Sequence, residues 1–285
     1  MTQPDLSGHV IAITGANSGV GKGTTHGLAA MGARILMICR NPERGEAARQ
    51  EIITATGNQQ IDLIIGDLSY QADVHRVADQ VKASTDRLDV LINNAGGIFA
   101  KRSVSRDGIE MTWALNHLAY FHLTSLLIDL LKASAPARVV SVSSNGHRAT
   151  GMRFDDLEFR RVYRPFIAYC HSKLANVLFS NELARRLDGS GVTSNALHPG
   201  GVASNFSRNN GRVSEVAMDL LKPLMRSEAD GARSSIYLAS SPEVAGVSGH
   251  FFNQFQRDVS PARAARSLED AHRLWLISME MTGLA

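Results

Sequence analysis

Residues 8–21 read Gly8-His9-Val10-Ile11-Ala12-Ile13-Thr14-Gly15-Ala16-Asn17-Ser18-Gly19-Val20-Gly21, and this stretch decides the fold. Its first six residues form an apolar run of strand length, and a helical pattern begins after Gly21. The segment between them is rich in glycine, which tolerates positive φ and lets a ligand approach the backbone where a Cβ would collide. We therefore expect a strand, a tight turn and a helix in succession.

The start of that helix is a candidate site for a phosphate group. Its first N–H groups have no partner within the helix, and the helix dipole places partial positive charge there. The spacing Gly15-x-x-x-Gly19-x-Gly21 differs from the common dinucleotide fingerprint Gly-x-Gly-x-x-Gly. A kinase-type P-loop is excluded, because five residues rather than four separate Gly15 from Gly21, and Gly23 follows Lys22 where Ser or Thr is needed.

Strand-like and helix-like segments alternate through most of the chain. After the first strand, strands are expected at 33–39, 61–65, 88–92, 138–142, 192–197 and 250–253, and helices at 42–56, 70–83, 108–131, 167–187 and 227–240. The alternation predicts an α/β fold: residues 1–285 form a single Rossmann-like, doubly wound domain with a seven-stranded parallel sheet flanked by helices on both faces.

Three segments lie outside the alternation. Residues 145–166 and 201–223 would follow carboxyl ends of strands, where open α/β sheets bind ligands, so we expect them to form a substrate lid. The alternative is that they are surface decoration. Residues 262–281 are amphipathic and predict a helical extension at the C-terminus.

Composition excludes several classes of protein. Hydrophobic residues make up 44% and charged residues 20% of the chain, which is an ordinary globular balance. Lys and Arg number 30 against 27 Asp and Glu, too small an excess to indicate a nucleic-acid partner, and no His/Cys/Asp pattern has metal-ligand spacing. Two cysteines, Cys39 and Cys170, suit a reducing compartment, and no apolar stretch reaches the roughly 18 residues of a membrane span. We expect a soluble, cytoplasmic protein without a metal.

Tyr169 and Lys173 lie four residues apart in the helical stretch Ala168–Asn176, so both side chains should leave the same face. A free phenol titrates near 10, and a neighbouring cation lowers that pKa. A unit charge roughly 4 Å away, at an effective dielectric of about 20, is worth about 4 kcal/mol, which bounds the shift at about 3 pKa units. The pair predicts a general acid/base. The alternative is a half-buried ring beside a solvated charge.

Four motifs occur in one order: Thr14-Gly15-x-x-x-Gly19-x-Gly21, Asn93-Asn94-Ala95-Gly96, Ser143-Ser144 and Tyr169-x-x-x-Lys173. With them the chain resembles the short-chain dehydrogenase/reductase superfamily from about residue 7 to 255. It is most similar to the retinol-dehydrogenase-like branch, through Cys39-Arg40-Asn41, Ala168-Tyr169-Cys170-His171-Ser172-Lys173-Leu174-Ala175-Asn176, His198-Pro199-Gly200 and Leu274-Trp275-x-x-Ser278.

The resemblance implies a catalytic role for four residues. Tyr169 would exchange a proton with the substrate oxygen, while Lys173 would lower the pKa of Tyr169 and hold the nicotinamide ribose. Ser144, which the family pattern favours over Ser143, would hydrogen-bond the same oxygen and stabilise its developing charge. Asn116 would hold a water in the proton relay; alternatively, it satisfies a kinked helix.

The resemblance also implies a nicotinamide dinucleotide. Arg40 ends the second strand where NAD enzymes carry an acid, so it can pair with the 2′-phosphate of NADP(H). The alternative is an Arg40 stacked on adenine without a phosphate. Besides Tyr169 and Lys173, the expected cofactor contacts are Gly15, Asn17, Ser18, Gly19, Val20, Gly21, Arg40, Asp67, Leu68, Asn94, Ala95, Gly96, Pro199, Gly200, Val202 and Ser204.

These features predict an NADP(H)-dependent oxidoreductase that interconverts a ketone or aldehyde and an alcohol, with NADPH driving reduction in the cell. A fairly apolar small-molecule substrate is implied by the branch and by the aromatic residues of the variable segments, Phe154, Phe159, Phe166 and Phe206. One alternative is a ketoreductase or dehydrogenase for a polar biosynthetic or catabolic intermediate. Another is a non-catalytic NADP-sensing regulator. Subunits would pair as homodimers or homotetramers through helices 108–131 and 167–187.

Overall fold

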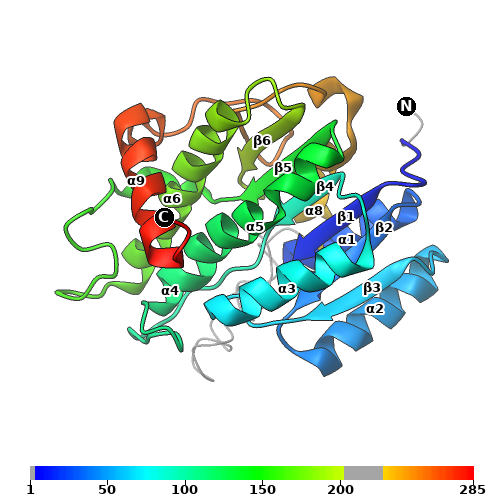
Figure 1. Cartoon of the computed structure of the whole chain (residues 1–285), viewed down its shortest axis with the longest axis horizontal. Helices are drawn as coiled ribbons and strands as arrows, with labels where there is room; N and C mark the ends of the chain where they lie inside the picture. The colour runs from blue at the N-terminus through cyan, green and yellow to red at the C-terminus, as the bar shows by residue number, and fades with distance from the viewer. Residues whose placement is uncertain (1–3, 202–226) are drawn as a thin grey trace.

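The computed structural model describes residues 4–201 and 227–285, and a seven-stranded parallel sheet runs through them (Figure 1). The strand order is β3-β2-β1-β4-β5-β6-β7, so the sheet winds outward in both directions from β1 and β4. The strands are β1 Val10–Thr14, β2 Arg34–Cys39, β3 Ile61–Ile65, β4 Val90–Asn93, β5 Ala137–Val142, β6 Val192–Leu197 and β7 Phe251–Phe252. The doubly wound α/β fold predicted from the alternation is confirmed.

Helices cover both faces of this sheet (Figure 1). One face packs against α3 Gln71–Ser84, α5 Ala119–Ala133 and α6 Pro165–Arg186. The other packs against α1 Gly19–Ala30, α2 Pro42–Thr56 and α8 Glu228–Ser240. Because both faces are buried, the strands are apolar on successive residues: all five residues of β1 are buried, and the four before Thr14 are apolar.

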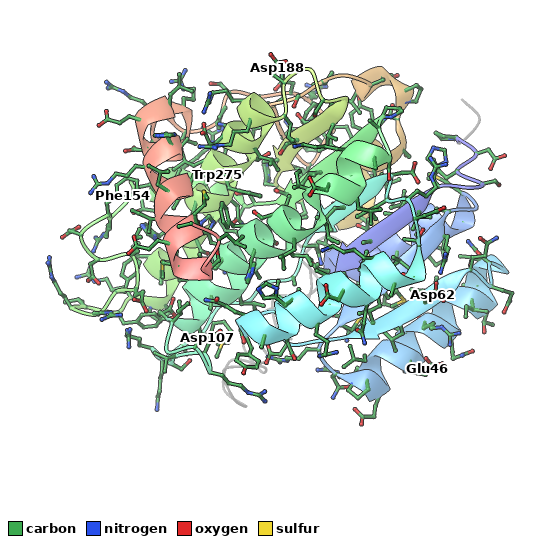
Figure 2. All side chains as sticks on the ribbon, in the orientation of Figure 1. Glu46, Asp62, Asp107, Phe154, Asp188 and Trp275 are labelled. Atoms are coloured by element: carbon green, nitrogen blue, oxygen red, sulfur yellow. The ribbon has the colours of Figure 1, made fainter. Side chains whose placement is uncertain are left out.

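The C-terminal segment lies across α6. After a 3₁₀ turn at Arg263–Arg266, helix α9 Leu268–Thr282 places Trp275 against Phe121 of α5 and Phe179 of α6, with ring centroids 4.9 and 6.1 Å apart (Figure 2). A helix of the same chain therefore covers part of the α5–α6 face through which pairing was predicted.

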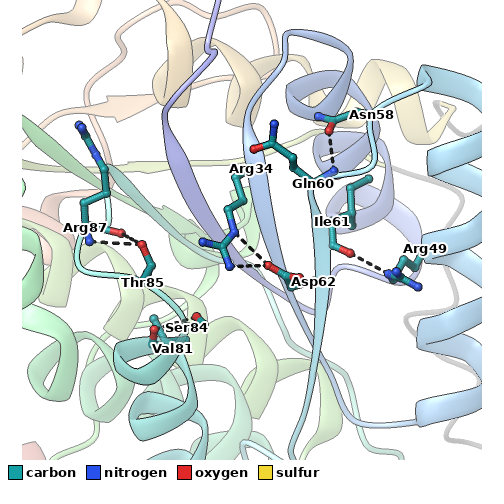
Figure 3. A network of polar contacts seen from close by, with 10 residues as sticks. All are labelled: Arg34, Arg49, Asn58, Gln60, Ile61, Asp62, Val81, Ser84, Thr85 and Arg87. Carbon is teal, nitrogen blue, oxygen red and sulfur yellow. Dashed lines mark hydrogen bonds and ion pairs between the residues drawn. The ribbon is translucent and has the colours of Figure 1, made fainter.

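Side-chain contacts join β2 and β3 near the amino ends of these strands (Figure 3). Arg34 donates from Nε and Nη2 to Asp62 Oδ2, at 3.0 and 2.8 Å, and Arg49 of α2 donates to the carbonyl of Ile61. These contacts hold the edge strand β3 to β2 and α2, at the opposite end of the strands from their carboxyl ends.

The expected helix 108–131 is interrupted. Gly108 has a φ of +76°, which ends the preceding turn, and the first helical residues form α4 Met111–Trp113, capped by the carboxylate of Glu110. A π-helical turn, η1 Ala114–Leu118, then joins α4 to α5. Such turns often lie at functional sites.

Other boundaries also differ from the prediction. Helix α1 begins at Gly19, inside the glycine-rich turn, and α6 begins at Pro165, whose fixed φ suits a first helical position. The first predicted lid segment contains a 3₁₀ turn, η2 Asn145–Ala149, while the second lies outside the described residues except for Gly201. In the described ranges, no helix combines the length and the apolar character that a bilayer crossing requires.

Candidate active site

A pocket of about 680 Å³ opens at the carboxyl ends of the strands. It lies where the strand order reverses between β1 and β4, the usual place for a dinucleotide in such sheets. Most of the predicted residues line it: Gly15, Asn17, Ser18, Gly19, Val20, Arg40, Asp67, Leu68, Asn94, Ala95, Gly96, Ser144, Tyr169, Lys173, Pro199 and Gly200. Gly21 and Asn116 lie outside its lining, and Val202 and Ser204 are not among the described residues.

The glycine-rich turn forms a cradle in which Gly15 and Gly21 leave no room for a side chain. Gly15 and Gly19 have φ values of +66° and +57°, and a Cβ on Gly21 would stand 2.2 Å from the carbonyl oxygen of Gly15. Asn94 clamps the turn by donating from Nδ2 to the carbonyl of Thr14 at 2.8 Å. The residues present therefore fit a pyrophosphate laid against backbone N–H groups.

The guanidinium groups of two arginines line the same pocket as the glycine-rich turn. Arg40 follows β2, and Arg44 lies in the first turn of α2, where the side chain of Asn41 caps its backbone N–H at 2.8 Å. Both arginines are exposed, and neither has an ion-pair partner within the described residues. Sequence reasoning missed Arg44, although its position four residues after Arg40 offered a signal.

The two adjacent serines have different partners. The hydroxyl of Ser144 hydrogen-bonds the phenol of Tyr169 and accepts from the backbone N–H of Gly146 at 3.1 Å. Ser143 is buried and donates to the backbone carbonyl of Lys173 at 2.7 Å. The geometry brings Ser144, rather than Ser143, to the phenol.

Tyr169 and Lys173 lie on one face of α6, as their four-residue spacing predicts, and both side chains are desolvated. Lys173 Nζ donates to the carbonyl of Val142 at 2.9 Å and lies 5.9 Å from the centroid of the Tyr169 ring. Burial raises the pKa of Tyr169 to about 12, although the bond from Ser144 opposes the rise. Burial also lowers the pKa of Lys173 to about 7.

The expectation that the pKa of the phenol is lowered by Lys173 stays a prediction. Its ammonium lies over the ring face and is bound to a carbonyl, so desolvation of the phenol dominates.

Asn116 lies in the π-helical turn η1 and is fully buried. Its Oδ1 accepts from the N–H of Gly97 at 2.9 Å, while Nδ2 donates to the carbonyl of Gly97 at 2.9 Å and to Ser172 Oγ at 3.0 Å. The side chain thus joins the loop after β4 to α6, as the kinked-helix alternative requires. The proton-relay role stays a prediction.

The remaining candidates separate into pocket and core. Ile98, Leu115 and Phe166 add apolar surface to the pocket. Phe159 is buried in the core, whereas Phe154 packs under the guanidinium of Arg273.

Two further polar side chains of the motif region have protein partners. His171 is buried and accepts from the N–H of Arg153 at 3.0 Å, a structural role, and Tyr163 donates to the carbonyl of Phe99 at 2.9 Å. Over residues 4–201 and 227–285, no three His, Cys, Asp or Glu side chains gather as metal ligands.

This fold agrees with what comparison with known proteins shows. The model of the short chain dehydrogenase family matches residues 9–214, and the chain belongs to that family. It is 42% identical to human retinol dehydrogenase 12, over 99% of this chain and 89% of that protein.

Two solved structures are similar over most of this chain. An uncharacterized protein from Mycobacterium paratuberculosis has a TM-score of 0.81 and 33% identity, with 99% of this chain and 96% of that one covered. RhlG of Pseudomonas aeruginosa, solved as an NADP active-site complex, has a TM-score of 0.70 and 26% identity, with 93% and 100% covered.

The protein is thus an oxidoreductase of this family, and its relatives point to alcohol and aldehyde interconversion.

Proposed function

We propose that this protein is an NADP(H)-dependent oxidoreductase that interconverts an apolar aldehyde or ketone and the corresponding alcohol, with Tyr169 as general acid/base. One observation carries the proposal: the phenol of Tyr169, bonded to Ser144, lines the same pocket as the glycine-rich turn. A bound dinucleotide can therefore extend from the turn to the phenol.

The chemistry follows from the two hydroxyl groups. Bound NADPH supplies a hydride for the carbonyl carbon. The phenol of Tyr169 would give its proton to the substrate oxygen. Ser144 donates a hydrogen bond to that oxygen as negative charge develops on it. Lys173, which lines the same pocket, would hold the nicotinamide ribose.

The preference for NADP(H) rests on Arg40 and Arg44. Two guanidinium groups at the adenosine end can clasp a 2′-phosphate, and no carboxylate ends β2 to bind the free hydroxyl of NAD. The NADP complex of RhlG supports the same assignment.

The apolar substrate preference rests on Ile98, Leu115 and Phe166, and on the retinol dehydrogenase relatives. A retinoid-like aldehyde or alcohol fits this reasoning. A cytoplasmic site of action is proposed from Cys39 and Cys170, which are buried free thiols.

The test is reduction of retinal and of small polar ketones by NADPH, followed through the loss of NADPH absorbance. Tyr169→Phe should reduce kcat for the preferred substrate by about 100-fold or more, with the Kd of NADPH unchanged. Tyr163→Phe is the matched control, since its hydroxyl bonds the Phe99 carbonyl. Turnover by Tyr169→Phe at the wild-type rate would refute the proposed role.

A further inference from the structure

One hydrogen bond joins the glycine-rich turn to a distant part of the chain. The N–H of Gly19, the first residue of α1, donates to Glu228 Oε1 at 2.6 Å. Glu228 is the first residue of α8, 209 positions later in the sequence. A carboxylate thus binds an N–H group of the helix end at which a pyrophosphate is expected.

The amino end of α1 has few other acceptors. Ser18 is at the N-cap, but its side chain makes no capping hydrogen bond, and the first turn of α1 contains no acidic residue. The partial positive charge of the helix end is therefore complemented by Glu228. A dinucleotide pyrophosphate carries the same sign of charge and requires the same kind of N–H donor.

The backbone around Glu228 is closely fitted to α1. A Cβ on Gly23 would stand 2.5 Å from the carbonyl oxygen of Glu228, so the absence of a side chain there permits the contact. Ser227 also caps α8 by accepting from the N–H of Asp230 at 3.0 Å. With the backbone held in place, the side chain of Glu228 is the part that can leave Gly19.

We propose that Glu228 is an internal competitor for the cofactor pyrophosphate, which must displace its carboxylate from Gly19. The carboxylate stabilises the cofactor-free protein and weakens the binding of NADP(H), so product cofactor is released more readily. This inference rests on the proposed function, because it assumes that the dinucleotide occupies the cradle.

The experiment measures the Kd of NADP⁺ and of adenosine 2′-monophosphate, by calorimetry, for the full chain and its variants. Glu228→Gln keeps an acceptor for the Gly19 N–H but removes the charge. Asp230→Asn is the matched control: it removes the same charge from the same helix turn, and Asp230 bonds Ser227 and Arg233 rather than Gly19.

Glu228→Gln should tighten NADP⁺ binding about tenfold, equivalent to about 1.4 kcal/mol, while Asp230→Asn changes it less than twofold. Adenosine 2′-monophosphate reaches Arg40 and Arg44 but has no pyrophosphate, so its Kd should not change. No gain beyond that of Asp230→Asn, or an equal gain for both ligands, would overturn the inference. If Glu228→Gln does not fold, Glu228→Ala takes its place, and it should tighten NADP⁺ binding in the same way.

The outcome also separates this inference from the function on which it rests. NADP⁺ binding without a gain in Glu228→Gln overturns the competitor role alone. Failure of the wild type and of every variant to bind NADP⁺ overturns the proposed function together with the inference.

Discussion

Replacing Lys173 with Met should stabilise the cofactor-free protein at neutral pH. Burial lowers the pKa of Lys173 from 10.5 to about 7, and a shift of this size corresponds to a cost of roughly 5 kcal/mol for the charged form. The bond to the Val142 carbonyl and the contacts with the Tyr120 and Tyr169 rings act on the same charged form, so the net shift already contains what they return. Met fills a similar volume without a charge, so Lys173→Met should gain about 4 kcal/mol at pH 7.

The sign of the pH dependence follows from the lowered pKa. Between about pH 7 and 10.5 the folded protein binds fewer protons at Lys173 than the unfolded chain, so this residue makes stability rise with pH through that window. Lys173→Met lacks the rise. Its advantage should shrink by roughly 2 to 3 kcal/mol between pH 7 and pH 9.

Urea unfolding of the wild type and of Lys173→Met, without cofactor, measures both quantities. The difference in unfolding free energy between the two proteins is compared at pH 7 and at pH 9, which cancels the groups they share. A difference that does not vary with pH would show that Lys173 is not desolvated as its burial indicates. A less stable Lys173→Met at pH 7 would show that the ammonium contacts outweigh the cost of burial.

Two further predictions concern the cradle and the buried histidines. Gly21→Ala should weaken NADP(H) binding at least about tenfold and lower Tm, because its Cβ would press on the Gly15 carbonyl; Gly151→Ala, with no atom within 4 Å, is the control for both measurements. Burial lowers the pKa of His117 to about 3 and that of His171 to about 4, so at pH 5 these histidines are neutral in the folded protein but protonated in the unfolded chain. Lowering the pH from 7 to 5 should therefore reduce the unfolding free energy by about 2 kcal/mol for each of the two histidines. An unfolding free energy that is equal at these two pH values would contradict this.

Much of the fold was predictable because its signals are local. Helix α2 spans Pro42–Thr56 as predicted, since Pro42 suits its first position and Gly57, with a φ of +75°, ends it. The parallel sheet was also predictable, because strands buried on both faces must be apolar throughout. In each case the residues that define the element lie within it.

The interruption before α5 could not be predicted in the same way. The apolar pattern from Gly108 onward fits one long helix, but the π-helical turn depends on Asn116 bonding Gly97 and Ser172, which are distant in sequence. Glu228 illustrates the same limit for the site. No local pattern connects it with Gly19, because only the packing of α8 on α1 brings the two residues together.

The spacing of Tyr169 and Lys173 predicted that both side chains line one face of a helix, but spacing alone does not give their pKa values. Helical periodicity places two side chains on one face, whereas their pKa values depend on how much water the rest of the fold excludes. Here burial raises the pKa of Tyr169 and lowers that of Lys173, so both shifts favour the neutral form of the group. Burial alone moves the pKa of Tyr169 away from neutrality, so the spacing of the pair does not by itself give the pKa at which the phenol works once a cofactor is bound.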